Sequence, residues 1–128
     1  MIKFKVSLLA ITLFAFSVLS NATNNTVVEW APFVKVASAS DQELIAAASQ
    51  VNAGFLALQA GFIKRELVKK SDTEYADIVY WDSQKNAQAA GSKVESCTVC
   101  MGYFQLMDMK ASETSGAGFS YYSIIKTW

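Results

Sequence analysis

The stretch from Gly61 to Ala87 (GFIKRELVKKSDTEYADIVYWDSQKNA) constrains the fold more than any other part of the chain. It contains two largely apolar runs, joined by a polar turn at Ser71-Asp72-Thr73 and followed by a helix start at Asp82-Ser83. β-Branched and aromatic residues recur in both runs, as is typical of strands. We therefore predict a β-hairpin, with strands over 62–70 and 74–81, that leads directly into a helix.

An amphipathic helix is expected immediately before this hairpin. Ser40 and Glu43 have the S-x-x-E spacing of a capping box, which marks a helix start. Gly61 is the kind of residue that ends a helix. Between them, apolar side chains recur at helical spacing: Leu44, Ala48, Val51, Phe55 and Leu58. The pattern predicts a helix over about 41–60.

The remaining segments complete a β-α-β-β-α-β order. A strand is expected over 26–36, where Pro32 requires an edge position or a bulge because proline has no N–H to donate. A second helix is expected from about Ser83, with a break at Gly91, and helical spacing resumes at Cys97 and continues to about Asp108. A loop over 110–118 and a closing strand over 119–128 follow. This order predicts an α+β, ferredoxin-like sandwich, in which helices cover one face of an antiparallel sheet.

Both faces of the predicted sheet are apolar. In the strand over 74–81, one face carries Tyr75, Val79 and Trp81, and the other carries Ala76, Ile78 and Tyr80. Helices cover one face only, so the second apolar face needs another partner. We therefore expect the protein to be a homodimer.

The first 22 residues have the features of a secretory signal peptide. Two lysines precede an uncharged run from Val6 to Leu19, and Ser20-Asn21-Ala22 places small residues at the cleavage site. The run is shorter than the roughly 20 residues that cross a bilayer, although an uncleaved anchor is the alternative. We expect a periplasmic or secreted protein with one domain over 23–128, which meets a membrane only through this leader.

Charge and composition exclude several classes of function. The chain has 11 basic and 11 acidic residues, and the two lysines of the leader are among the basic ones. No basic patch appears, so nucleic acid is not an expected partner. The chain has no histidine, the residue most often used for acid–base catalysis near neutral pH. We expect neither a metal site nor a cofactor.

The chain resembles the dimeric α/β-barrel superfamily that contains antibiotic-biosynthesis-monooxygenase-like (ABM-like) domains. The resemblance is carried by Ala60-Gly61-Phe62 at the end of the first helix, by the hairpin, and by Ile78 to Ser83 with Ala87 in the following helix. It implies a dimer formed through the open sheet faces and a small apolar or aromatic ligand. Some members oxidise polycyclic phenols without a cofactor. Haem-degrading members bind iron through a histidine, which is absent here.

The resemblance also implies a pocket between sheet and helices that contains aromatic, Asn and Arg side chains. The candidates in this sequence are Trp30, Asn52, Arg65, Tyr80 and Trp81, with Glu29 or Asp77 as a carboxylate. The alternative is that the aromatic residues fill the core and the dimer interface, while Arg65 pairs with a carboxylate across the hairpin. The protein would then be a non-catalytic binding or structural protein.

The sequence Cys97-Thr98-Val99-Cys100 leaves three alternatives open. The cysteines are a thiol redox pair at a helix N-terminus, with Ser96 as the N-cap, or a structural pair on a buried helix face that a local disulfide can join. A metal site is the third alternative, although two cysteines without histidine make a poor zinc site. A thioredoxin-like fold is not expected, because the only proline, Pro32, precedes the motif.

Overall fold

The computed structural model describes residues 25–116 and 118–128. The predicted signal peptide over 1–22 lies outside these residues. Among the residues described, no helix has the length and apolar character needed to span a membrane.

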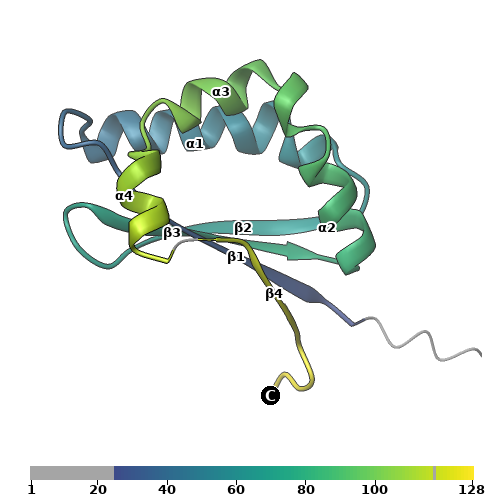
Figure 1. Cartoon of the computed structure of the whole chain (residues 1–128). Helices are drawn as coiled ribbons and strands as arrows, with labels where there is room; N and C mark the ends of the chain where they lie inside the picture. The colour runs from purple at the N-terminus through teal and green to yellow at the C-terminus, as the bar shows by residue number, and fades with distance from the viewer. Residues whose placement is uncertain (1–24, 117) are drawn as a thin grey trace, which may run out of the picture.

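A four-stranded antiparallel sheet carries all the helices on one face (Figure 1). The strands lie in the order β2-β3-β1-β4, which confirms the predicted ferredoxin-like α+β fold. The elements in chain order are β1 (Val27–Val34), α1 (Asp41–Gly54), the 3₁₀ turn η1 (Leu56–Leu58), β2 (Phe62–Lys69), β3 (Glu74–Trp81), α2 (Gln84–Gly91), the 3₁₀ turn η2 (Val94–Ser96), α3 (Thr98–Phe104), α4 (Met109–Thr114) and β4 (Ser120–Ser123).

Helix α1 begins at the capping box that the sequence indicated. The Ser40 hydroxyl accepts a hydrogen bond from the Glu43 N–H at 3.2 Å, and the Glu43 carboxylate accepts one from the Ser40 N–H at 2.7 Å. The apolar stripe of the helix faces the sheet and is buried at Leu44. The helix ends at Gly54, earlier than predicted, and η1 carries the chain to Gly61, whose φ of 80° favours glycine.

The second half of the chain agrees with the prediction in one respect and differs from it in two. The helix that follows Ser83 ends at Gly91, the predicted break, and η2 and α3 follow it; the loop expected over 110–118, however, contains α4. Asp108 caps α4 by accepting a hydrogen bond from the Ala111 N–H at 2.9 Å. The closing strand is also shorter than predicted, because it is confined to β4.

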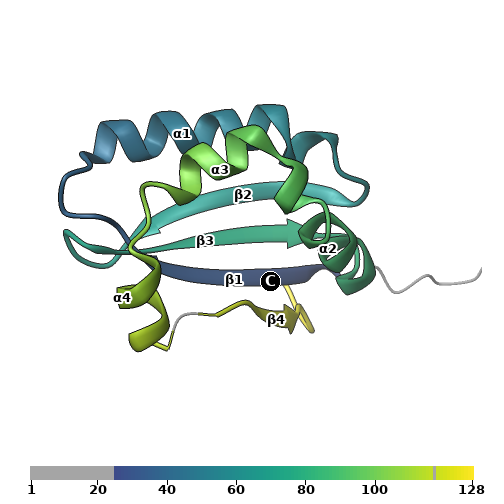
Figure 2. The ribbon, with the colours of Figure 1, turned by 45° about the horizontal axis from the view of Figure 1, so that its top comes forward.

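Helix α4, and not β4, lies beside the end of β1 (Figure 2). β4 pairs with β1 only as far as Trp30, and the Val34 N–H donates instead to the Ser112 hydroxyl at 2.9 Å. Because N–H groups alternate along a strand, Pro32 has its nitrogen on the same side as the Val34 N–H. No strand pairs with β1 on the side to which the Pro32 nitrogen points, as the predicted edge position requires, although β1 as a whole lies between β3 and β4.

The two faces of the sheet have different environments. On the face under the helices, Trp81, Val79 and Tyr75 are buried in the core with Leu44 from α1. On the opposite face no helix of the described chain covers Trp30, and its side chain is 37% exposed. The strand alternation predicted from the sequence thus separates a covered face from an open face.

Candidate functional site

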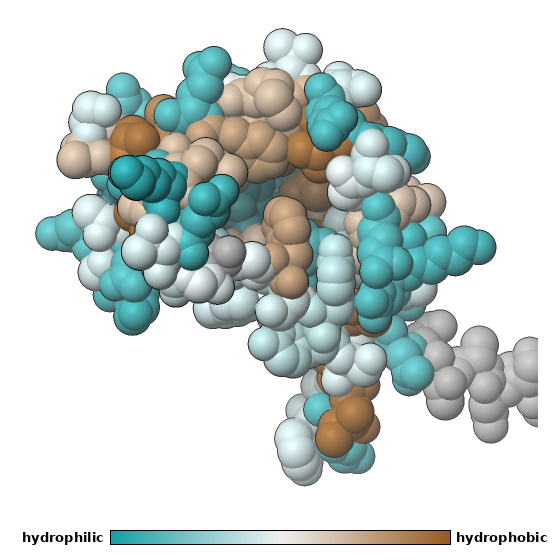
Figure 3. Space-filling view, in the orientation of Figure 1, coloured by the Kyte–Doolittle hydropathy of each residue, from teal (hydrophilic) through white to brown (hydrophobic). Residues whose placement is uncertain are grey.

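A cavity of about 460 Å³ lies between the covered face of the sheet and the helices. The space-filling view shows a hollow with apolar walls on the side of the molecule that α2, α3, α4 and β4 surround (Figure 3). The volume is in the range of sites that bind small organic ligands. Apolar side chains form most of its wall, among them Phe33, Phe55, Trp81, Val94, Phe104 and Phe119.

Three strands and one helix position the central groups of this cavity. Glu29 of β1 lies opposite Val79 of β3 and opposite Tyr121 of β4, so all three lie on the covered face. Helix α2 faces the cavity with Ala87 and Ala90, both of which are buried. Small side chains on this helix leave space above the sheet that larger ones would occupy.

Glu29 is a carboxylic acid in a largely apolar environment. Burial raises its pKa to about 7, the charge of Asp77 adds to this rise, and the Trp81 indole opposes it as a hydrogen-bond donor. Burial and the neighbouring Glu29 also raise the pKa of the Tyr121 phenol. Near neutral pH, the Glu29 carboxyl group therefore exists in both its protonated and its ionised form.

The indole N–H of Trp81 lies in the same cavity. The Trp81 side chain is 1% exposed, and Nε1 makes no hydrogen bond of standard geometry among the residues that the structure describes. The Glu29 carboxyl is nevertheless near enough for the indole to act on it as a donor and lower its pKa. The N–H and the carboxyl therefore form one polar group at the cavity wall, which a ligand oxygen can join.

Asp77 also lines the cavity, but other side chains already bind its carboxylate. Arg65 Nε and Nη2 lie 2.8 and 2.7 Å from Asp77 Oδ1, and the Tyr103 hydroxyl donates to Oδ2 at 2.9 Å. Arg65 Nη1 donates to the Ala48 carbonyl of α1 at 2.7 Å. Burial raises the pKa of Asp77, and both Arg65 and Tyr103 counter this rise. This network joins β2, β3, α1 and α3, and we assign it a role in stabilising the fold.

The structure does not bring the five predicted pocket residues together. Trp81 lines the cavity, as do the two predicted carboxylates. Asn52 and Arg65 line a separate, more open groove between α1 and β2. Trp30 pairs with Ile78 and Tyr80 pairs with Val28 on the open face. The prediction that Trp30 and Trp81 form walls of one pocket is wrong. Trp81 lies opposite Val27, and because successive side chains along β1 point to alternate faces, Trp30 faces the other side of the sheet.

The sequence did not indicate that β4 and the segment before it contribute to the cavity. Phe119 and Tyr121 of the predicted closing strand line it, as do Ser112 and Glu113 of the segment that was expected to be a loop. The one available signal was Tyr121 itself, which alternates with its neighbours in a predicted strand.

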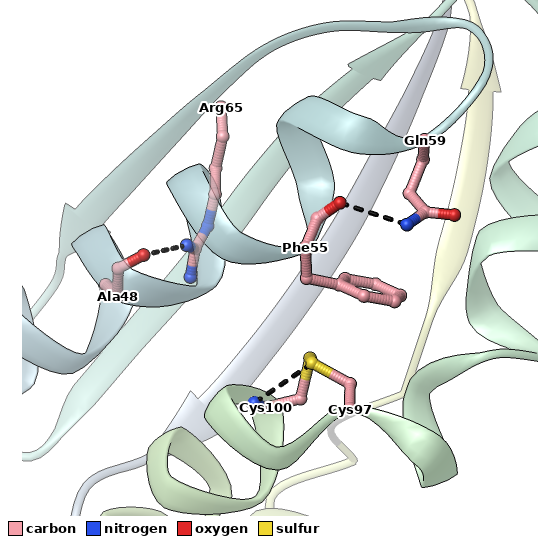
Figure 4. Close-up of a disulfide and its surroundings, with 6 residues drawn as sticks. All are labelled: Ala48, Phe55, Gln59, Arg65, Cys97 and Cys100. Carbon is pink, nitrogen blue, oxygen red and sulfur yellow. Dashed lines mark hydrogen bonds between the residues drawn. A yellow bond between two sulfur atoms is a disulfide. The ribbon is translucent and has the colours of Figure 1, made fainter.

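Cys97 and Cys100 form a disulfide at the N-terminus of α3. The ring of Phe55 lies beside the disulfide, and Arg65 reaches the Ala48 carbonyl nearby (Figure 4). Both cysteines are buried, and Cys97, rather than Ser96, is the N-cap of α3. Within the part of the chain that the structure describes, no group of histidine, cysteine or carboxylate side chains is arranged to hold a metal ion.

Comparison with solved structures identifies the fold. SnoaB from Streptomyces nogalater, described as a cofactor-independent oxygenase, superposes with a TM-score of 0.62 and 16% identity, over 80% of this chain and 96% of that one. A protein from Bordetella bronchiseptica, described as a putative antibiotic biosynthesis monooxygenase, gives 0.61 and 10%, over 81% and 99%.

This chain has the ABM-like fold. The resemblance drawn from the sequence is thus confirmed for the fold. No protein-family model and no curated protein matches the sequence.

The Arg65–Asp77 contact predicts a large effect of Arg65→Ala on stability. The substitution leaves a buried carboxylate without its partner, so we expect the free energy of unfolding to fall by about 3–5 kcal/mol in urea denaturation. Lys64→Ala is the control, because the Lys64–Glu66 pair is about half exposed and such pairs contribute about 0–1 kcal/mol. Equal effects of the two substitutions would show that the buried network does not stabilise the fold.

Proposed function

We propose that the protein binds a small apolar or aromatic molecule in the cavity and acts as a cofactor-independent monooxygenase on an aromatic or phenolic substrate. The observation that carries this proposal is the pairing of an apolar cavity with two inward polar groups, the Glu29 carboxyl and the Trp81 N–H. Such a site holds a flat apolar ring and orients one polar substituent.

The fold supports this proposal without carrying it. One fold can host several functions, so the activity depends on the residues of the site. SnoaB, which is described as a cofactor-independent oxygenase, shows that this fold accommodates oxygenation without a cofactor. The chemistry is balanced when the substrate supplies all the electrons: a ring CH₂ and O₂ give a ring C=O and water. Dioxygen is then the only co-reactant.

The competing proposal is a non-catalytic binding or structural protein with the same fold. It shares the cavity but requires no proton transfer and no oxygen consumption. A CxxC redox function has less support, because both sulfur-bearing side chains are buried and neither lines the cavity. Oxygen uptake during turnover therefore separates the catalytic proposal from the binding proposal.

The ligand proposal is tested with anthrone and a naphthoquinol, by recording tryptophan fluorescence and oxygen uptake in parallel. Gly91 lines the cavity at the end of α2, and a Cβ there would meet nothing within 4 Å. We expect Gly91→Phe to weaken binding at least tenfold, because the ring occupies the ligand's space. Gly102→Phe is the matched control, since Gly102 has equally open surroundings in α3 but does not line the cavity.

Three outcomes of this experiment are informative. Tight binding with oxygen uptake supports the monooxygenase. Tight binding without oxygen uptake supports the non-catalytic protein. Absence of binding to any of these compounds would contradict the proposal itself.

We also propose that the protein is a homodimer, in which the open sheet faces of two copies pack together. This face carries apolar side chains from three strands: Val28, Trp30, Ile78, Tyr80 and Tyr122. A large exposed apolar patch usually marks an interface, and a two-fold axis makes one face complementary to itself. The apolar C-terminal residues Ile125 and Trp128 are also almost fully exposed in the single chain.

Trp30→Glu is expected to disrupt this dimer, because it places a charge in the centre of the proposed interface. Light scattering at micromolar concentration should show a dimer for the wild type and a monomer for the variant, with unchanged circular dichroism. Ile45→Glu is the control, since Ile45 is exposed on α1, away from the open face. A wild-type protein that stays a soluble monomer would rule out this assembly.

We further propose that the protein is exported and that residues 1–22 are removed. The disulfide supports this proposal, because disulfides persist mainly in oxidising compartments. Intact-mass measurement of protein from the periplasm or medium of the native host should give a chain that starts at Thr23. A mass that includes Met1 would instead indicate an uncleaved anchor.

A further inference from the structure

We propose that Glu29 is the general base of the cavity and takes a proton from a neutral carbon or oxygen acid bound there. This inference rests on the proposed ligand site and assigns to it a reacting group and a class of substrate. The cavity would then select enolisable aromatic ketones and phenols over carboxylates.

The position of Glu29 supports this role. Its side chain lies on the covered face of β1, between the partner positions in β3 and β4, and lines the cavity. The buried Trp81 N–H lies in the same cavity, makes no hydrogen bond of standard geometry within the described chain, and is near enough to Glu29 to lower the pKa of its carboxyl. An acceptor and a donor therefore face one apolar space, where a ligand with a proton to lose and an oxygen to hold would satisfy both.

The other charged groups that face the cavity leave Glu29 as the available base. Asp77 is bound by Arg65 and Tyr103, so its oxygens are already occupied. Two further lining carboxylates, Glu95 of η2 and Glu113 of α4, are exposed to solvent. The whole sequence lacks histidine, so no imidazole competes for the role.

The sign of the charge in the cavity restricts the ligand. All the ionisable side chains that line it are acids, namely Glu29, Asp77, Glu95, Glu113 and Tyr121; no lysine or arginine of the described chain does so. An anionic ligand such as a fatty-acid carboxylate would meet like charges in a medium of low dielectric constant. A neutral ligand avoids this repulsion.

The environment also gives Glu29 the proton affinity that a base needs. Burial and the Asp77 charge raise its pKa to about 7, with Trp81 opposing and the Tyr121 phenol beside it. A base whose pKa lies near the working pH combines a substantial ionised fraction with a strong tendency to accept a proton. An ordinary exposed glutamate is a weaker base.

The transfer itself conserves charge within the cavity. The C–H or O–H bond of the ligand breaks, a new O–H bond forms on the Glu29 carboxylate, and the electron pair stays on the ligand as an enolate or phenolate. One negative charge moves from the protein to the ligand, so no additional charge is buried. The Trp81 N–H can then donate to the ligand oxygen on which the charge develops.

Hydrogen–deuterium exchange of anthrone tests this step without oxygen. Under argon in D₂O, the wild-type protein should catalyse deuterium incorporation into the anthrone CH₂ group, followed by mass spectrometry. We expect Glu29→Gln to slow this exchange about 100-fold or more, the usual contribution of a general base, while the binding seen by tryptophan fluorescence is retained. Glu29→Asp should restore part of the rate, because it returns a carboxylate.

The pH profile and a control variant complete the test. The wild-type exchange rate should rise with pH and level off above about pH 7, as Glu29 loses its proton; Glu29→Gln should lose this step. Glu66→Gln removes a carboxylate from the open face of β2 and should leave the rate unchanged.

Wild-type protein that binds anthrone but exchanges it no faster than Glu29→Gln would overturn the inference and leave the ligand site intact. Failure of the wild type to bind anthrone counts against both.

Discussion

The buried contact between Arg65 and Asp77 holds together the part of the fold on which the cavity depends. The Arg65 side chain is 5% exposed, and its guanidinium joins the β2–β3 hairpin to the carbonyl of Ala48 in α1. Tyr103 brings α3 to the same carboxylate. Because an unpaired buried charge is far more costly than a paired one, these four elements are held in one arrangement. The helices and the strands that enclose the cavity are therefore fixed relative to one another.

The cavity itself results from small residues and short elements. Ala87 and Ala90 leave space beneath α2, and β4 begins only opposite Trp30, so α4 rather than a longer strand lies beside the end of β1. The Phe55 ring, which lines this space, lies beside the disulfide at the start of α3 (Figure 4). The apolar walls, with Glu29 and the Trp81 N–H side by side among them, are the basis of the ligand that we propose.

The two faces of the sheet have different proposed roles: one binds the ligand and the other forms the dimer. The covered face carries Glu29 and Trp81 into the cavity, and the open face carries Trp30 and Tyr80, which we propose contact a second copy of the chain. The same alternation explains why aromatic residues that are close in sequence have different proposed roles. It also separates the experiments: substitutions on the open face test the dimer, and those on the covered face test the chemistry.

The sequence by itself determined the elements with local signals. The capping box placed the start of α1, the polar turn placed the hairpin, and the alternation of side chains predicted a sheet with two apolar faces. It did not determine which of its aromatic and polar residues meet, because that depends on which face lies under the helices and on pairing between distant strands. Thus α4 escaped prediction, since its place depends on the hydrogen bond that the Val34 N–H of β1 donates to the Ser112 hydroxyl. Tertiary structure alone decided that Glu29, rather than Asn52 or Arg65, shares a cavity with Trp81, because burial among distant segments sets both its position and its proton affinity.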